Sequence, residues 1–163
     1  MKTFFSTTTL LFILGITTAS AIPLENAMTH SKPVEINTIL DTNKSWAGTL
    51  LPGFSAGQTA FKVLTFKISP GAKTSIHVHP LNGAGYILSG ELTMYSTEDT
   101  HGSFANPKQV KKIILKAGDA WTETVNTWHY GENNGSQDVK FIVVFAGQEG
   151  TPPTLTLELP TKK

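Results

Sequence analysis

Hydrophobic and polar residues alternate along short stretches of this chain. The clearest stretch is residues 61–68, where Phe61, Val63 and Thr65 fall on one side and Lys62 falls on the other. Alternation with a period of two is typical of a β-strand with one face buried, because successive side chains of a strand point to opposite sides. The stretch ends in a Ser-Pro-Gly sequence, which indicates a turn.

Similar short apolar stretches follow at close spacing, and nearly every gap between them carries Gly, Pro, Asn or Asp. We predict further strands over residues 34–40, 46–51, 75–79, 84–88, 91–96, 110–116, 120–124, 128–130, 139–146 and 154–159. Residues 98–109 are polar and predict a loop. After residue 21 no window shows the 3.6-residue period of a helix. The pattern therefore predicts an all-β protein, an antiparallel sandwich or barrel.

The first 21 residues have a different pattern. Lys2 precedes an apolar stretch, and Ala19-Ser20-Ala21 has the small residues of a cleavage site. This three-part arrangement predicts a secretory signal over residues 1–21. The alternative is an uncleaved anchor, but the apolar run is shorter than the roughly 20 residues that a membrane span needs. We expect a secreted or periplasmic protein that has no membrane contact after cleavage.

The remaining chain predicts one domain with a short extension. Residues 22–45 contain two prolines and little periodicity, which indicates an N-terminal arm with one candidate edge strand. Residues 46–163 carry the dense strand pattern and form the predicted barrel domain.

Composition excludes several classes of function. The 163 residues carry a formal charge of +1, so the chain lacks the basic field that nucleic-acid binding requires. There is no cysteine, which excludes disulfides and thiolate metal sites. All thirteen cations are lysines, so a bidentate guanidinium clamp on a carboxylate or phosphate is excluded as well.

Three histidines suggest metal chemistry. His77 and His79 lie two apart in a predicted strand, which places both imidazoles on one face. His129 lies in a different strand, and two strands can meet across the interior of a barrel. Three imidazoles suit one divalent transition metal ion, whether iron, manganese, copper, nickel or zinc.

The spacing of these histidines occurs within two glycine-bounded blocks. The first block contains Gly71, His77, His79 and Gly90, and the second contains Gly118, His129 and Asn133. Over roughly residues 45–159 the chain resembles the cupin family, whose members are small double-stranded β-helix or jelly-roll barrels. The resemblance implies that fold, a metal on His77, His79 and His129, and association into a homodimer through barrel edges.

The chain departs from the family pattern at three positions. Gly83 stands where the family has a glutamate ligand, and Thr124 and Asn126 stand where the second block has proline and glycine. Some cupin dioxygenases resemble this arrangement, with three histidines and no carboxylate ligand. Two alternatives follow: the three histidines hold a metal with an open position, or the barrel has lost its metal and kept a ligand pocket.

Two further residues are candidates for catalysis. Glu123 lies six residues before His129 and is the nearest carboxylate, suited to general acid–base work or to replacing the missing ligand. Its alternative is an ordinary exposed strand glutamate. Tyr86 is a candidate for the barrel mouth, where we expect one or two aromatic side chains from a larger set that also contains Tyr95, Trp121, Trp128 and Tyr130.

The sequence thus predicts an exported metal-binding cupin that acts on a small chelating substrate. Dioxygenase-like chemistry is favoured, and lyase, decarboxylase or isomerase chemistry on the same metal are alternatives. A hypothesis from another class is a non-catalytic secreted cupin that only binds a small ligand.

Overall fold

The computed structural model describes residues 34–54 and 56–157. The predicted signal over residues 1–21 and most of the predicted arm lie outside this part. Residues 34–40 have no regular secondary structure and are mostly exposed, so the strand predicted there is wrong. An alternating pattern in so short a stretch does not by itself suffice to form a strand.

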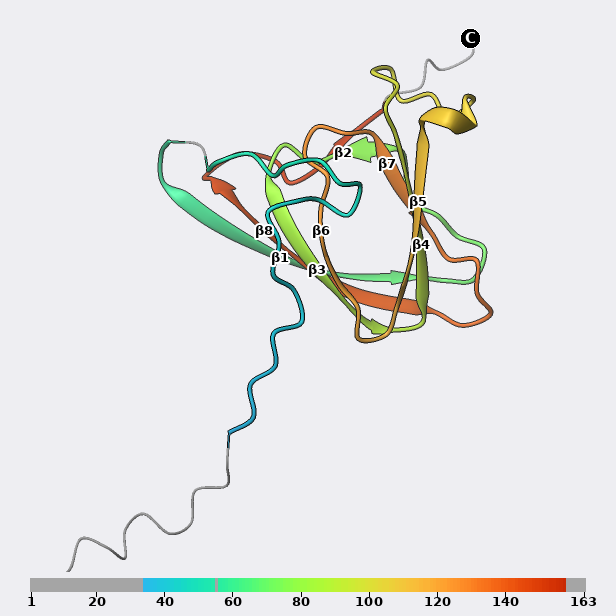
Figure 1. The fold of residues 1–163 in the computed structure, drawn as a ribbon, viewed down its shortest axis with the longest axis horizontal. Helices are drawn as coiled ribbons and strands as arrows, with labels where there is room; N and C mark the ends of the chain where they lie inside the picture. The colour runs from blue at the N-terminus through green and yellow to red at the C-terminus, as the bar shows by residue number, and fades with distance from the viewer. Residues whose placement is uncertain (1–33, 55, 158–163) are drawn as a thin grey trace, which may run out of the picture. The chain divides into compact units, whose positions relative to one another are not determined.

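The regular secondary structure of the described chain is β-strand apart from one short 3₁₀ helix, which confirms the all-β prediction (Figure 1). Its elements are β1 (Thr59–Ile68), β2 (His77–Val78), β3 (Asn82–Ser89), β4 (Glu91–Thr97), the 3₁₀ helix η2 (Pro107–Gln109), β5 (Val110–Lys116), β6 (Ala120–Thr122), β7 (His129–Glu132), β8 (Val139–Gln148) and β9 (Leu155–Thr156). In the described part of the chain no helix has the length and hydrophobicity that a membrane crossing needs.

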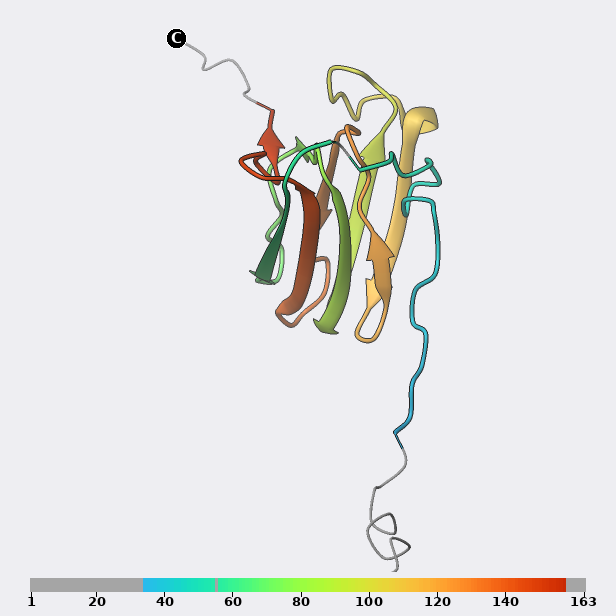
Figure 2. The same ribbon diagram turned by 90° about the vertical axis from the view of Figure 1, so that its left-hand side faces the viewer.

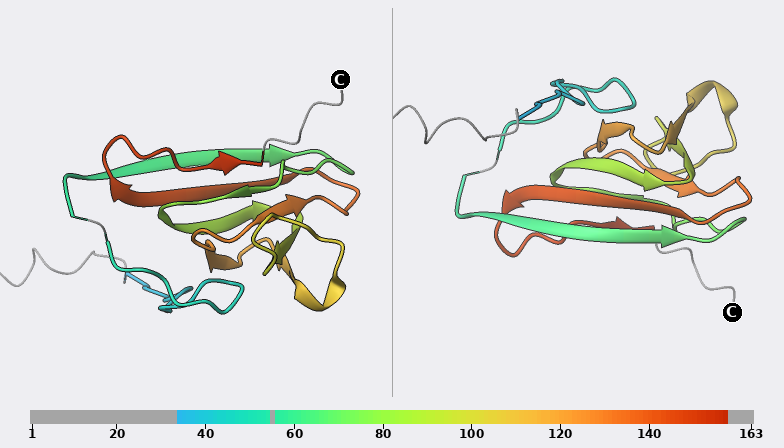
Figure 3. Two further views of the ribbon diagram at one scale, coloured as in Figure 1. Left: turned by 90° about the horizontal axis from the view of Figure 1, so that it is seen from above. Right: turned by 90° about the horizontal axis from the view of Figure 1, so that it is seen from below.

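The strands form two antiparallel sheets that face each other, with orders β1-β8-β3-β6 and β5-β4-β7-β2-β9. Figure 2 shows the first sheet from its face, with its strands upright and side by side, and the two views of Figure 3 show β1, β8 and β3 next to one another. Most neighbours in each sheet are far apart in sequence: β1 pairs along its whole length with β8, and only β4 and β5 form a pair of consecutive strands. This is the topology of a jelly roll, in which most consecutive strands lie in different sheets.

The core lies between the two sheets. On β8 every second residue points inward and is buried, and its partners come from both sheets. Phe66 stacks on Phe141 with ring centroids 4.7 Å apart, and Trp121 meets Phe141 edge-on at 5.7 Å. The core side chains from β8 are Val139, Phe141, Val143 and Phe145.

Two strands that the sequence predicted to be longer are short. Only two residues form β2 and two form β9, although β9 pairs with β2 and extends its sheet. Proline explains the end of β2, since Pro80 follows His79 and proline has no N–H for a strand ladder. The backbone at His79 therefore leaves the sheet directly after the two histidine positions.

Candidate metal centre

The structure brings His77, His79 and His129 together. His77 in β2 pairs directly with His129, the first residue of β7. His79 lies just beyond β2 and bridges Val125. Ring centroids are 4.3 Å apart for His77 and His129 and 4.8 Å apart for the other two pairs, and one nitrogen from each ring lies within 4.8 Å of the other two. The cluster matches the expectation from the two-residue spacing.

Backbone carbonyls fix the orientation of all three rings. Each Nδ1 donates a hydrogen bond to a main-chain oxygen: His77 to Ser75 at 2.7 Å, His79 to Pro153 at 2.7 Å and His129 to Thr127 at 2.8 Å. A carbonyl can only accept, so the proton of each neutral ring is on Nδ1 and the lone pair is on Nε2. A carbonyl on the far nitrogen is the usual support of a metal-ligating histidine.

The departures in the second block preserve the turn that presents His129. Asn126 has a φ of 52°, a left-handed conformation that glycine and asparagine adopt most readily. Thr124 is fully buried, and its hydroxyl lies 3.1 Å from Nδ1 of His129. Asparagine thus takes the conformational role of the family glycine, while threonine adds a polar contact to the ligand ring.

Glu123 is the fourth polar side chain of the cluster. Its Oε2 is 4.0 Å from Nε2 of His79 and 3.8 Å from Nε2 of His129. The residue is buried, and within the described residues neither Oε2 of Glu123 nor Nε2 of His129 has a hydrogen-bond partner. Buried polar atoms without partners are rare and call for an explanation such as an ion. The structure therefore excludes the alternative of an exposed strand glutamate.

The electrostatics of this cluster favour a bound cation. Burial lowers the pKa of His129 to about 3 and of His79 to about 4, and repulsion from the neighbouring rings acts in the same direction. Burial also lowers the pKa of His77. Neutral rings are the form that binds metals. Burial raises the pKa of Glu123 to about 7, and the nearby Trp121 indole acts in the opposite direction. The indole N–H has no hydrogen-bond partner of good geometry among the described residues.

A cavity of about 210 Å³ adjoins the cluster between the two sheets. Most of its wall is hydrophobic, and hydroxyl groups of Thr74, Ser75, Thr154 and Thr156 provide further polar atoms. Among the described residues no lysine lines it, so Glu123 and the histidines are its ionisable groups. The hydrophobic side chains of the wall are Phe66, Leu92, Met94, Trp121, Phe141, Val143 and Phe145.

Tyr86 does not lie where the sequence analysis placed it. It alternates along β3 with the inward Gly85 and Ile87, and it is absent from the cavity wall. Period two therefore directs its side chain to the outer face of the sheet, so its assignment to the site is wrong. Of the aromatic residues proposed for the mouth, Trp121 alone lines the cavity.

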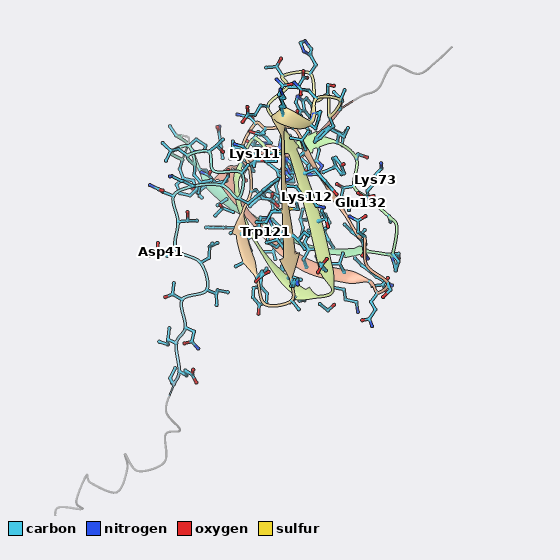
Figure 4. The ribbon with its side chains drawn as sticks, turned by 45° about the vertical axis from the view of Figure 1, so that its right-hand side comes forward. Asp41, Lys73, Lys111, Lys112, Trp121 and Glu132 are labelled. Atoms are coloured by element: carbon cyan, nitrogen blue, oxygen red, sulfur yellow. The ribbon has the colours of Figure 1, made fainter. Side chains whose placement is uncertain are left out.

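Tyr95 and Tyr130, two of the other proposed aromatic residues, lie outside the cavity wall. Tyr95 and Tyr130 stack with centroids 4.9 Å apart. Lys112 lies 5.5 Å from the ring of Tyr95 and Lys73 lies 5.8 Å from that of Tyr130; both lysines can be followed in Figure 4. Three cavity phenylalanines were missed, at positions 66, 141 and 145. The alternation of β8 contained the signal for two of them.

Comparison with known proteins places this site in a family. The family description "Cupin domain" matches residues 64–145, a span that contains the three histidines, Gly83 and Glu123. The chain belongs to the cupin family. A search of curated proteins found no match.

Solved structures of the same fold come from several bacteria. The oxalate decarboxylase of Lactobacillus farciminis, in its formate complex, is 19% identical with a TM-score of 0.48, and the match covers 65% of this chain and 32% of that one. The polyketide cyclase of Streptomyces resistomycificus is 22% identical with a TM-score of 0.46, covering 62% and 63%. A double-stranded β-helix protein of Klebsiella pneumoniae is 19% identical with a TM-score of 0.47, covering 87% and 100%. This chain thus spans about a third of the decarboxylase.

Proposed function

We propose that this chain is an exported metalloenzyme that holds one divalent transition metal at His77, His79 and His129 and acts on a small chelating substrate. The observation that carries the proposal is the shared orientation of the three rings. Their Nδ1 atoms are occupied by carbonyls, while their ligand nitrogens lie within 4.8 Å of one another. This donor set fits iron, manganese, copper, nickel or zinc.

The bound metal would supply a Lewis acid and a template, and for iron or copper also a redox centre. The protein's own contribution is position and exclusion of water. The hydrophobic wall formed by Phe66, Phe141 and Phe145 binds the apolar part of a substrate. The threonine hydroxyls at 154 and 156 are available to its polar end. A volume of about 210 Å³ restricts the substrate to a small molecule.

The composition of the wall favours dioxygenase-like chemistry among the reactions of such a site. A hydrophobic cavity suits an apolar co-substrate such as dioxygen and a chelating substrate with an apolar body. No described lysine lines it to neutralise a second carboxylate, which disfavours small dianions. Lyase, decarboxylase or isomerase chemistry would need a proton donor or acceptor, and Glu123 is the only carboxyl group in the described wall.

Metal content and oxygen uptake test this proposal. The mature chain, residues 22–163, purified without a histidine tag, is expected to retain close to one equivalent of metal. The iron- or copper-loaded protein is expected to consume oxygen with a member of a panel of β-diketones and enediols. The His77→Ala, His79→Ala double variant is the control and should do neither. Failure to bind any of the five metals after reconstitution would contradict the proposal.

A non-catalytic ligand-binding cupin is the second candidate, and the small hydrophobic cavity favours it. The same panel separates the two functions. Saturable binding of a chelator that shifts the spectrum of the metal, without any turnover by the loaded protein, would establish the binding protein. Loss of turnover together with binding in the double variant would establish the enzyme.

Export remains a prediction that rests on residues 1–21. When the full chain is expressed in a host with a secretion pathway, the recovered protein is expected to begin at Ile22. Intact-mass measurement of secreted or periplasmic and cytoplasmic fractions checks this. Recovery of the uncut chain in the cytoplasm alone would contradict it.

Association into a homodimer is a further proposal. The ten-residue strand β1 lies at the edge of its sheet, and its outward side chains Phe61 and Val63 are 70% and 60% exposed. A long exposed edge with apolar side chains favours pairing with an identical edge. Sedimentation of the mature chain measures the association state.

A further inference from the structure

Gly83 and Glu123 face each other across two paired strands. The register pairs Gly85 with Trp121 and Ala84 with Thr122, and it continues with a hydrogen bond of 2.8 Å from N–H of Glu123 to the carbonyl oxygen of Gly83. Both positions lie on the inner side of the sheet, because they alternate with the outward Ala84 and with Thr122. A side chain at either position would therefore enter the same part of the barrel.

Phe145 and Glu123 together fill the space above Gly83. A Cβ atom at position 83 would lie 2.8 Å from two ring carbons of Phe145 and 3.0 Å from Cγ of Glu123. A side chain at position 83 would therefore force the Phe145 ring to shift and would crowd Glu123. Glycine at 83 leaves this part of the barrel to these two side chains.

The carboxylate of Glu123 reaches the histidine cluster from this position. Its Oε2 lies 3.8 and 4.0 Å from Nε2 of His129 and His79, and it has no hydrogen-bond partner among the described residues. With metal–ligand bonds of about 2.0–2.2 Å, neighbouring ligand atoms of one ion lie roughly 3–3.5 Å apart. The two separations exceed this range by no more than about 1 Å.

We propose that Glu123 is the fourth protein ligand of the metal. It directly follows β6 and supplies the carboxylate that Gly83 lacks. The inference rests on the proposed metal site and refines it. The site then has three neutral nitrogens and one anionic oxygen, so the ion keeps a lower net charge than three histidines alone would give it. The carboxylate binds the metal and is not a free acid or base.

Substitution of Glu123 tests this assignment. Metal affinity is measured by competition with a chelator for the mature parent, Glu123→Gln and the control Glu132→Gln. Glu132 is a half-buried glutamate of β7, and its backbone forms an isolated β-bridge with Lys73 (Figure 4). It does not line the cavity. The visible spectrum of the Co²⁺-loaded proteins gives a second readout, because it reports on the ligands. Far-UV circular dichroism confirms that each variant is folded.

The expected result is a loss of roughly 100-fold or more in affinity for Glu123→Gln, because even groups outside the coordination sphere contribute 10–100-fold. The Co²⁺ spectrum of Glu123→Gln should also differ from that of the parent, while Glu132→Gln should match the parent in both readouts. Parent-like affinity and spectrum in Glu123→Gln would overturn the assignment and leave the three-histidine site intact. A parent that binds no metal would overturn the proposed function itself.

Discussion

In the His79→Ala variant, the stabilisation that metal gives to the folded protein is expected to disappear. A ligand at 100 times its dissociation constant raises the free energy of unfolding by about 2.7 kcal/mol when it binds only the folded state. His79 is 4% exposed and contributes one of the three converging nitrogens, so its removal leaves an incomplete site. Urea unfolding of the mature protein, with and without metal at that concentration, measures the difference directly.

His101→Ala is the matched control for this experiment. His101 is an exposed loop histidine outside the cluster, and its imidazole contacts the hydroxyl of Thr100. Its loss should leave the 2.7 kcal/mol difference unchanged within about 0.5 kcal/mol, as for most surface substitutions. Full metal-dependent stabilisation in His79→Ala would show that metal binds elsewhere on the chain.

Gly85→Ala is expected to lower the free energy of unfolding by about 3 kcal/mol. A Cβ atom at this position would lie 2.2 Å from Cζ2 of Trp121, and two further indole carbons lie within 2.5 Å. Trp121 is 2% exposed and packs against Phe141, so the ring could move only toward the cavity that it lines. Overpacking a buried site typically costs 1–3 kcal/mol, and a rigid ring held opposite a strand places this case at the upper end. Urea unfolding followed by tryptophan fluorescence measures the change.

Gly53→Ala provides the comparison. A Cβ at Gly53 meets no atom within 4 Å, and the residue does not adopt a left-handed backbone conformation. The same methyl group should therefore change stability by no more than about 0.5–1 kcal/mol, and in the stabilising direction if it restricts the unfolded chain. Equal unfolding free energies for the two variants would mean that the indole moves aside freely.

The sequence predicted the parts of the site that depend on local spacing. His77 and His79 share a face because they are two residues apart in extended chain, and that argument needs no knowledge of the rest of the fold. The long strands were found for a similar reason: the pattern over residues 110–116 coincides with β5. The family resemblance added His129, which lies in a separate block of sequence and pairs with His77 in the structure.

Features that depend on how strands pair could not be predicted in the same way. Alternation shows that Tyr86 and its neighbours at 85 and 87 face opposite ways, but it does not show which way is inward. On β1 the core takes Leu64, Phe66 and Ile68, and the side with Phe61 and Val63 is exposed. The tertiary pairing of β1 with β8 decides that orientation, and no local pattern contains it.

The structural role of Gly83 could not be predicted for the same reason. In the sequence, glycine at this position means that the family's glutamate ligand is absent, which left open whether the site had lost its metal. Only the pairing of β3 with β6 shows that Glu123, 40 positions later, lies opposite Gly83 and, together with Phe145, borders the space above it. A motif written along one strand cannot describe a carboxylate that comes from the neighbouring strand.

The carbonyl that orients His79 belongs to Pro153, and β9 immediately after it pairs with β2. Leu157 extends this contact with a hydrogen bond from its N–H to the carbonyl oxygen of Ile76. During synthesis, all three histidines and Glu123 leave the ribosome well before residues 153–157. A chain that is clipped after β8 would carry all three histidines and Glu123 and still lack the oxygen that aligns the ring of His79. At the proposed metal site such a chain would bind the ion roughly 10–100-fold more weakly.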